Sequence, residues 1–196
     1  DIWSESYHDM AAAELRFEYF PSAGDMITLG GFFKHFKNPI EAHLIESGSG
    51  LNYNYSNASS AGSYGLELDV RKSFIGLENS NSFFRAFRHF ALVFNASLIH
   101  SALRTDDPNE RDPVRRMQGQ APYIVNTGLF YENPNTGLMV SVMYNIIGER
   151  IAYVGNKSSP HMYQVPRNLL DITVNQKLGK HFVLKGGVRD IFNQPI

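Results

Sequence analysis

The chain of 196 residues contains no cysteine, which excludes disulfide bridges, a catalytic thiolate and cysteine ligation of a metal. No run of 18 apolar residues occurs, so a membrane-spanning helix is excluded as well. Neither sign of charge dominates, because 18 Lys and Arg stand against 19 Asp and Glu. A formal net charge of −1 predicts no broad surface for nucleic acid.

Aromatic residues and a strict alternation are what the chain does have. Aromatics make up 13% of the residues, with 14 Phe and 10 Tyr, a composition that favours β structure. After the turn sequence 133–137, one apolar file runs through Leu138, Val140, Val142, Tyr144 and Ile146, while the interleaved file is mixed. A period of two is typical of a β-strand with one apolar face and one wetter face.

The same alternation predicts eight strands along the chain. The expected strands are 14–20, 26–36, a third that ends with 66–71, 90–103, 123–131, 138–147, 170–175 and 182–191. Segment 73–89 fits this pattern least, because its Phe residues lie near helical spacing and predict a short helix or an irregular turn. The sequence therefore indicates an all-β protein of antiparallel up-and-down strands.

The lengths of the connections favour a membrane barrel over a soluble sandwich. Short turns are expected at 21–25, 133–137 and 178–181, and long polar connections at 37–60, 104–120 and 153–166. With strands running up and down, the short connections fall at one end and the long ones at the other, with 73–89 as the exception. This asymmetry is typical of outer-membrane barrels. Ligand specificity is then expected in the loops around 42–60, 104–120 and 153–166.

No catalytic constellation emerges from the motifs. The sequences 47–50 and 62–65 place Ser beside Gly without the spacing of a nucleophile elbow, and predict a flexible loop and a strand entry. The seven His residues show no metal-ligand spacing, and His35 and His100 are expected at an interface near strand ends. We therefore predict no catalytic residue, no metal site and no cofactor, and leave the substrate-binding residues unassigned.

The charged segments predict solvated surface. Residues 106–110 lack the spacing of a calcium loop. Arg111, Arg115 and Arg116 beside Asp112 predict a solvated loop or a rim that faces lipopolysaccharide. The aromatic cluster 83–90 predicts an anchor at the membrane interface or packing under a loop. The polar residues expected to line a barrel lumen are Glu67, Asp69, Arg71, Asp171 and Lys185.

Several stretches, in order, resemble hallmark segments of TonB-dependent outer-membrane receptors. They are RFEYFP (16–21), GFFKHF (31–36), NPIE (38–41), GLELDVRK (65–72), QGQAPYIVN (118–126), YN (144–145), GERI (148–151), PRNLLD (166–171) and VRDIFN (188–193). They cover nearly the whole chain and are similar to the late part of the barrel. The resemblance implies a segment of a large transmembrane β-barrel of about 22 strands, with an N-terminal plug and a TonB-contacting segment.

By this resemblance residues 1–196 are a partial receptor barrel domain in the bacterial outer membrane, without the plug domain and the final strands. The implied partners are outer-membrane lipid and lipopolysaccharide, the TonB system through the missing N-terminal part, and an unknown nutrient ligand that the receptor imports. The chain is expected not to be an enzyme. Two alternatives stay open: a soluble β-sandwich binding module, which would fold without detergent, and an outer-membrane barrel enzyme, which would need an acid/base set at one rim.

Overall fold

The computed structural model describes residues 9–47, 50–74 and 87–194, and within these ranges every regular element is a β-strand. No helix in this described part of the chain is long and apolar enough to cross a membrane.

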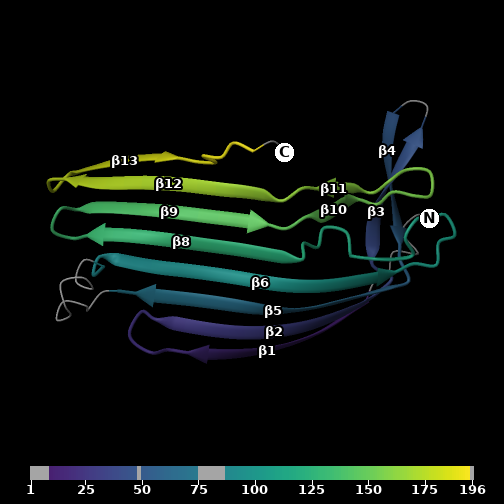
Figure 1. Ribbon diagram of the computed structural model, residues 1–196, viewed down its shortest axis with the longest axis horizontal. Helices are drawn as coiled ribbons and strands as arrows, with labels where there is room; N and C mark the ends of the chain where they lie inside the picture. The colour runs from purple at the N-terminus through teal and green to yellow at the C-terminus, as the bar shows by residue number, and fades with distance from the viewer. Residues whose placement is uncertain (1–8, 48–49, 75–86, 195–196) are drawn as a thin grey trace.

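One antiparallel sheet dominates the structure, with its long strands in the order β1-β2-β5-β6-β8-β9-β12-β13 (Figure 1). The strands are β1 (Asp9–Tyr19), β2 (Met26–Lys37), β5 (Ser60–Ser73), β6 (Phe90–Arg104), β8 (Tyr123–Asn133), β9 (Leu138–Ile147), β12 (Arg167–Leu178) and β13 (Phe182–Val188). Each long strand pairs with the next long strand along the chain, so the topology is up-and-down. All eight predicted strands are confirmed, with changes only at their ends.

The long connections contain more structure than the sequence predicts. Five short strands lie in them: β3 (Ile40–Ser47), β4 (Gly50–Asn57), β7 (Val114–Arg115), β10 (Arg150–Tyr153) and β11 (Met162–Gln164). β3 pairs with β4 and β10 with β11 as separate hairpins, while β7 extends the main sheet beside β6. The interpretation of these connections as polar loops was therefore wrong in part, because their backbone groups pair in hairpins despite a sequence without clear alternation.

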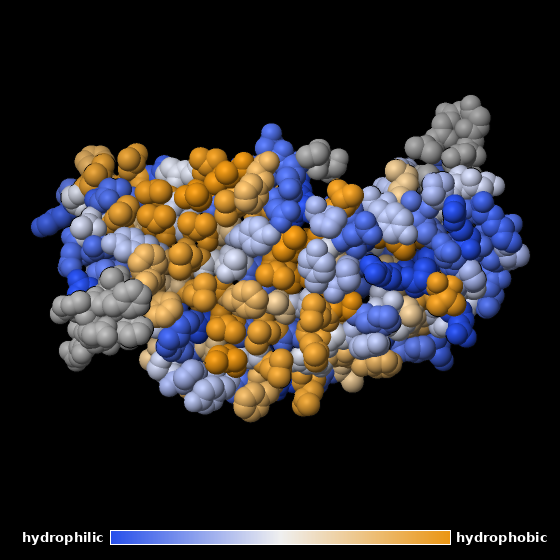
Figure 2. Space-filling view, viewed as in Figure 1, coloured by the Kyte–Doolittle hydropathy of each residue, from blue (hydrophilic) through white to orange (hydrophobic). Residues whose placement is uncertain are grey.

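The register sorts the side chains of the main sheet onto two faces. Leu15 lies opposite Gly31, and the same row continues through Leu66 and Leu98. This apolar face also carries Phe17, Leu29, Leu68, Phe94, Val125, Val142, Ile172 and Leu184. Figure 2 shows apolar side chains gathered over the long strands and polar ones over the end where β3, β4, β10 and β11 lie.

The opposite, polar face carries the residues that the sequence placed together. Glu67, Asp69, Arg71, Asp171 and Lys185 all fall on it by register. Next to Asp69 in the same row, the side chains of Asn95, Asn126 and Asn145 form a hydrogen-bonded ladder across three strands. One face of the sheet is therefore apolar and the other carries hydrogen-bonding side chains, as the alternation predicts.

The three short turns lie together at one end of the sheet, opposite the long connections (Figure 1). Gly137 and Gly179 adopt φ angles of 69° and 68° in two of them, a conformation that glycine takes without a steric cost. The short-turn and long-connection ends that the sequence predicts are confirmed.

Asp25 ties the first short turn to the neighbouring strand. Its carboxylate accepts hydrogen bonds from Lys72 Nζ, from Ser22 Oγ at 2.7 Å and from the Ser73 N–H at 2.8 Å. These bonds, led by that from Lys72, lower the pKa of Asp25 from 3.8 to about 2, although burial acts in the opposite direction. The charged carboxylate thus acts as a clip between the turn and the end of β5.

At the same end, three aromatic rings pack where β5 gives way to β6. The ring centroids of Phe74 and Phe87 are 6.4 Å apart, and those of Phe87 and Phe90 are 6.1 Å apart. Most of the expected helix or irregular turn, with Phe83 and Phe84, lies outside the described residues. The part that is described supports local aromatic packing.

The eighth strand ends three residues earlier than predicted. Asp190 adopts a φ of 52°, and the Ile191 N–H donates to the Leu170 carbonyl at 2.9 Å. Asp190 also forms an ion pair with Arg167. The chain after Val188 therefore stays beside β12 but leaves the regular strand pairing.

Candidate functional site

The three long connections meet at one end of the sheet and pack into a single body, which we call the mouth assembly (residues 38–47, 50–59, 105–121 and 149–166; Figure 1). The Val154 N–H donates to the Ala42 carbonyl at 3.2 Å, which joins the β10–β11 hairpin to β3. The Lys157 N–H donates to the Asn109 carbonyl at 3.1 Å, which joins the same hairpin to the 105–121 connection. The structure thus brings together all three segments in which ligand specificity was expected.

A buried arginine lies at the centre of the mouth assembly. Arg115 Nη1 and Nη2 donate to the two carboxylate oxygens of Glu41 at 2.8 and 2.7 Å, a bidentate pair. Both side chains are only 4% exposed. Because Arg115 lies opposite Leu103, its side chain belongs to the polar face of the sheet. β7 and β3 therefore hold this ion pair over the polar face of the strands.

Glu110 completes the buried charge cluster. Its carboxylate lies 3.5 Å from Arg115 Nε and 3.7 Å from His43 Nδ1, and its side chain is 1% exposed. Burial by itself would lower the pKa of Arg115, but the hydrogen bonds and charges of Glu41 and Glu110 raise it above its ordinary value. Arg115 therefore stays charged between two carboxylates.

This cluster corrects the expectation of a wholly solvated charged loop. Arg115 and Glu110 are buried, whereas Arg111, Arg116 and Asp112 are exposed as expected. The physical reason is the partner Glu41, which lies 74 residues from Arg115 and removes the cost of burying its charge.

Gln118 bridges the two hairpins through its side-chain amide. Its Oε1 accepts the Ala42 N–H at 2.8 Å, and its Nε2 donates to the Ala42 and Ala152 carbonyls at 3.0 and 2.8 Å. The amide therefore supplies hydrogen bonds that a neighbouring strand would give to β3 and β10. Its amide nitrogen and oxygen are both fully used in this structural role.

His161 fixes the tip of the β10–β11 hairpin. Its Nδ1 accepts the Gly155 N–H at 2.9 Å, so the ring proton lies on Nε2, which is 3.0 Å from an Asp112 carboxylate oxygen. Gly155 has no room for a side chain, because a Cβ there would lie 2.3 Å from the Ser159 carbonyl oxygen. The hairpin tip is thus locked to the 105–121 connection.

An apolar floor lies under the mouth assembly. Leu103, Ala58 and Ala61 are buried, and Phe36 and Met117 pack against them. Ala61 and Leu103 project from the polar face, so Met117 carries the 105–121 connection over that face. The connection therefore lies over the polar face at this end of the sheet.

The charged side chains at the centre of the mouth assembly pair with one another. The guanidinium of Arg115 is paired with the carboxylates of Glu41 and Glu110. In the part of the chain that the structure describes, no cluster of three His, Cys, Asp or Glu residues could hold a metal ion. The serine of the 62–65 motif lies within β5, and two residues of the 47–50 motif lie outside the described residues.

Exposed tyrosines lie on the β3–β4 and β10–β11 hairpins of the mouth assembly. The exposed side chains are Tyr53, Tyr55 and Tyr163. The Tyr53 and Tyr153 ring centroids are 4.9 Å apart, and a hydrogen bond between their hydroxyls raises the pKa of Tyr53. The sequence predicts no role for these residues, because neither the Asn- and Tyr-rich segment around Tyr53 and Tyr55 nor the segment around Tyr163 carries a local signal for a hairpin.

Comparison with known proteins identifies one family whose sequence model matches most of the chain. A sequence model of the family described as TonB dependent receptor-like, beta-barrel matches residues 11–191. No curated protein matches the chain.

Three examples illustrate the solved structures that share the fold. The ferric yersiniabactin uptake receptor FyuA from Yersinia pestis gives a TM-score of 0.69 at 16% identity, over 95% of this chain and 25% of that chain. The copper transporter OprC gives 0.67 at 13% identity, over 99% and 27%. The siderophore receptor PirA from Acinetobacter baumannii gives 0.61 at 13% identity, over 95% and 28%. The chain thus spans about a quarter of the length of these receptors.

Proposed function

Because the chain belongs to the TonB-dependent receptor-like β-barrel family, we propose that its long strands form part of the wall of an outer-membrane receptor that binds and imports a nutrient ligand. Residues 1–196 are assigned to the late part of the barrel. The plug, the final strands and the contact with the TonB system are assigned to parts of the receptor outside these residues. The chain has no enzymatic role in this proposal.

The two-faced sheet is the observation that carries the proposal. Strands of about 9–11 residues cross a bilayer, and the long strands other than β13 have 10 to 15 residues. Eight consecutive strands keep an apolar face toward one side and a hydrogen-bonding face toward the other. In a membrane barrel, the first face meets lipid and the second lines the lumen.

The mouth assembly supports the receptor role at the outer end of the wall. Outer-membrane barrels carry their long loops on the extracellular side. The buried pair Arg115–Glu41 and the bridging Gln118 hold the hairpins rigid, so the exposed tyrosines of β4 and β11 are presented without a large loss of conformational freedom on binding. The receptors that share the fold take up ferric yersiniabactin, siderophores or copper, so such ligands are the first to test.

Location and uptake together test the proposal. Cells of the source organism are fractionated and blotted, and uptake of labelled ferric siderophores and copper is compared between cells with and without the protein. We expect the protein in the outer-membrane fraction, and uptake that needs both the protein and an energised inner membrane. Recovery of the protein in a soluble fraction would refute the proposal and would favour the β-sandwich alternative.

A second pair of strains tests the mouth. Tyr55→Ala removes the most exposed of the tyrosines named above, at 72% exposure, and Tyr144→Phe serves as the matched control in the sheet. Weaker uptake in the first strain alone is expected if the hairpins contact the ligand. Equal uptake in both would remove the hairpin tyrosines from the binding surface.

A further inference from the structure

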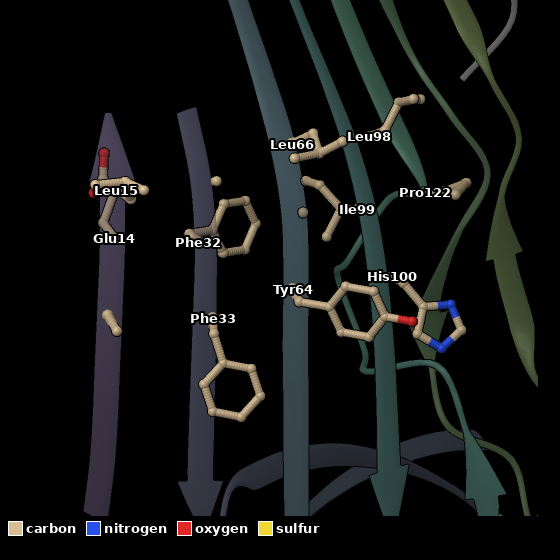
Figure 3. A pocket seen from close by; sticks show the side chains of 13 residues that line it. Glu14, Leu15, Phe32, Phe33, Tyr64, Leu66, Leu98, Ile99, His100 and Pro122 are labelled. Carbon is tan, nitrogen blue, oxygen red and sulfur yellow. The ribbon is translucent and has the colours of Figure 1, made fainter. Parts of the chain in front are cut away.

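The apolar face contains a hollow of about 740 Å³ between β1, β2, β5 and β6 (Figure 3). Ala13 and Gly31 leave space, and the larger side chains of Leu15, Phe33 and Leu66 surround it. A Cβ on Gly31 would meet only the Leu66 side chain at 3.6 Å and a backbone oxygen at 3.8 Å. The space above Gly31 is therefore open on the face proposed to meet lipid.

Two rings separate the hollow from the mouth end of the same face. Tyr64 lies opposite both Phe33 and His100, so the three side chains form one row. The Tyr64 and His100 rings lie side by side, with centroids 5.0 Å apart (Figure 3). Both rings line the hollow and form its wall on the mouth side.

A row of cations follows on the mouth side. Lys37 lies opposite Ser60, and Ser60 lies opposite Arg104, so the two cations stand two strands apart, about 10 Å in backbone spacing. Asp9 lies across from Lys37, and Asp106 is bonded to Ser59 Oγ at 2.6 Å. Arg104 is thus the stronger anion-binding partner of the pair.

The spacing between the cations and the hollow matches one lipid leaflet. Along β2, the row of Phe33 lies four residues, about 14 Å, from the row of Lys37, and the row of Gly31 lies six residues, about 20 Å, from it. Strand tilt in a barrel makes the corresponding depths below the cation row smaller, and one leaflet contributes about 15 Å of hydrocarbon. A phosphate held at the cations therefore places an acyl chain over the hollow.

We propose that the hollow and the cation row together bind one phosphorylated acyl lipid of the outer leaflet, with its phosphate between Lys37 and Arg104 and a chain over Gly31. This assignment rests on the proposed outer-membrane location. Charge complementarity selects a phosphorylated lipid over a neutral one, and the apolar hollow selects an acyl lipid over free phosphate.

Native mass spectrometry of the protein purified in detergent from its own outer membrane tests the site. The probe is bisphosphorylated lipid A, compared with the same lipid stripped of its phosphates and with inorganic phosphate as a competitor. Lys37→Gln/Arg104→Gln should weaken lipid A binding roughly 30-fold, at about fivefold for each cation near a membrane surface. Lys180→Gln, in the short turn at the other end, is the charge control and should leave binding unchanged.

Filling the hollow tests the acyl part independently. Gly31→Phe should reduce retention of lipid A, whereas Gly186→Phe, at another open position on the apolar face, should not. If Gly31→Phe fails to assemble, Gly31→Leu provides the same comparison with a smaller side chain. Equal retention by the Gly31 and Gly186 variants, loss of the preference for phosphates, or full displacement by inorganic phosphate would each overturn the lipid site.

These outcomes are distinguishable from failure of the proposed function. A protein that fractionates with the outer membrane but shows none of the variant effects loses the lipid site alone. A protein recovered in a soluble fraction loses the membrane assignment on which the lipid site rests.

Discussion

Replacing Arg115 by Met tests whether the mouth assembly depends on its buried ion pair. The change keeps an unbranched side chain of similar length but removes the guanidinium that faces Glu41 and Glu110, whose side chains are 4% and 1% exposed. Two buried carboxylates then lose their cation, while Glu41 keeps the hydrogen bond from the Gln118 N–H at 3.3 Å. Breaking a buried pair in this way costs about 3–5 kcal/mol, and the main sheet does not share that loss.

Hydrogen exchange measures the effect where it is expected. The amides of Ala42 and Val154 both take part in bonds that join the elements of the mouth assembly. A loss of about 3 kcal/mol should speed their exchange by at least about 100-fold, while the Val142 amide in the sheet keeps its protection. Arg116→Met, which removes an exposed charge one residue away, is the matched control and should change neither.

A second variant separates charge from packing. In Arg115→Met/Glu41→Met the unpaired carboxylate of Glu41 is gone, so protection of the Val154 amide should recover in part. If the amides of Ala42 and Val154 exchange at the same rate in Arg115→Met as in Arg116→Met, the buried pair does not hold the mouth assembly together.

Three further predictions concern the sheet, the short-turn end and the hairpin tip. Val142→Arg, on the apolar face, should lower the free energy of unfolding in lipid by about 2–4 kcal/mol, and Ser141→Arg, on the polar face, should lower it by much less. Urea titration measures both values, and equal effects would mean that the two faces are wrongly assigned. The pKa of Asp25 is lowered from 3.8 to about 2, so its clip stabilises the folded protein fully above pH 4 and is lost as the pH falls toward 2. The Asp25→Asn variant should therefore melt at a lower temperature than the parent protein at pH 7. Its melting temperature should also fall less than that of the parent between pH 4 and pH 2. An equal fall in both proteins would contradict this role of Asp25. Gly155→Ala forces a Cβ to within 2.3 Å of a backbone oxygen and should cost about 1–3 kcal/mol locally, visible as faster proteolysis of the β10–β11 hairpin; unchanged cleavage would contradict it.

The strands of the main sheet could be predicted because each of them carries its own signal. Alternation along 138–147 fixes both the strand and the side of each residue, since the side-chain period of two is a local property. The turn glycines near 137 and 179 mark where strands reverse. Neighbouring strands in space are neighbouring long strands in sequence, so the topology follows once the strands are known.

The mouth assembly could not be predicted in the same way. Glu41 and Arg115 are 74 residues apart, and nothing near either one signals that the other neutralises it. In the sequence, Gln118 is one more polar residue of a loop, because its hydrogen-bonding partners Ala42 and Ala152 lie far from it along the chain. Residues 150–164 lack alternation because β10 and β11 are only four and three residues long. The site depends on side-chain contacts between residues far apart in the sequence, and a local sequence pattern does not predict such contacts.

The separation of Glu41 from Arg115 also bears on the order in which the molecule is made. Each long strand of the sheet needs only its predecessor, so pairing can proceed stepwise while the chain is still arriving. The Arg115–Glu41 bond waits for the 105–121 connection, and the bridge from Gln118 to Ala152 waits for β10. Closing contacts of such long range is slow, because loop entropy is lost before any bond forms. β3 therefore waits first for Gln118 and then for Val154, and the mouth assembly is complete only when the β10 segment has been delivered.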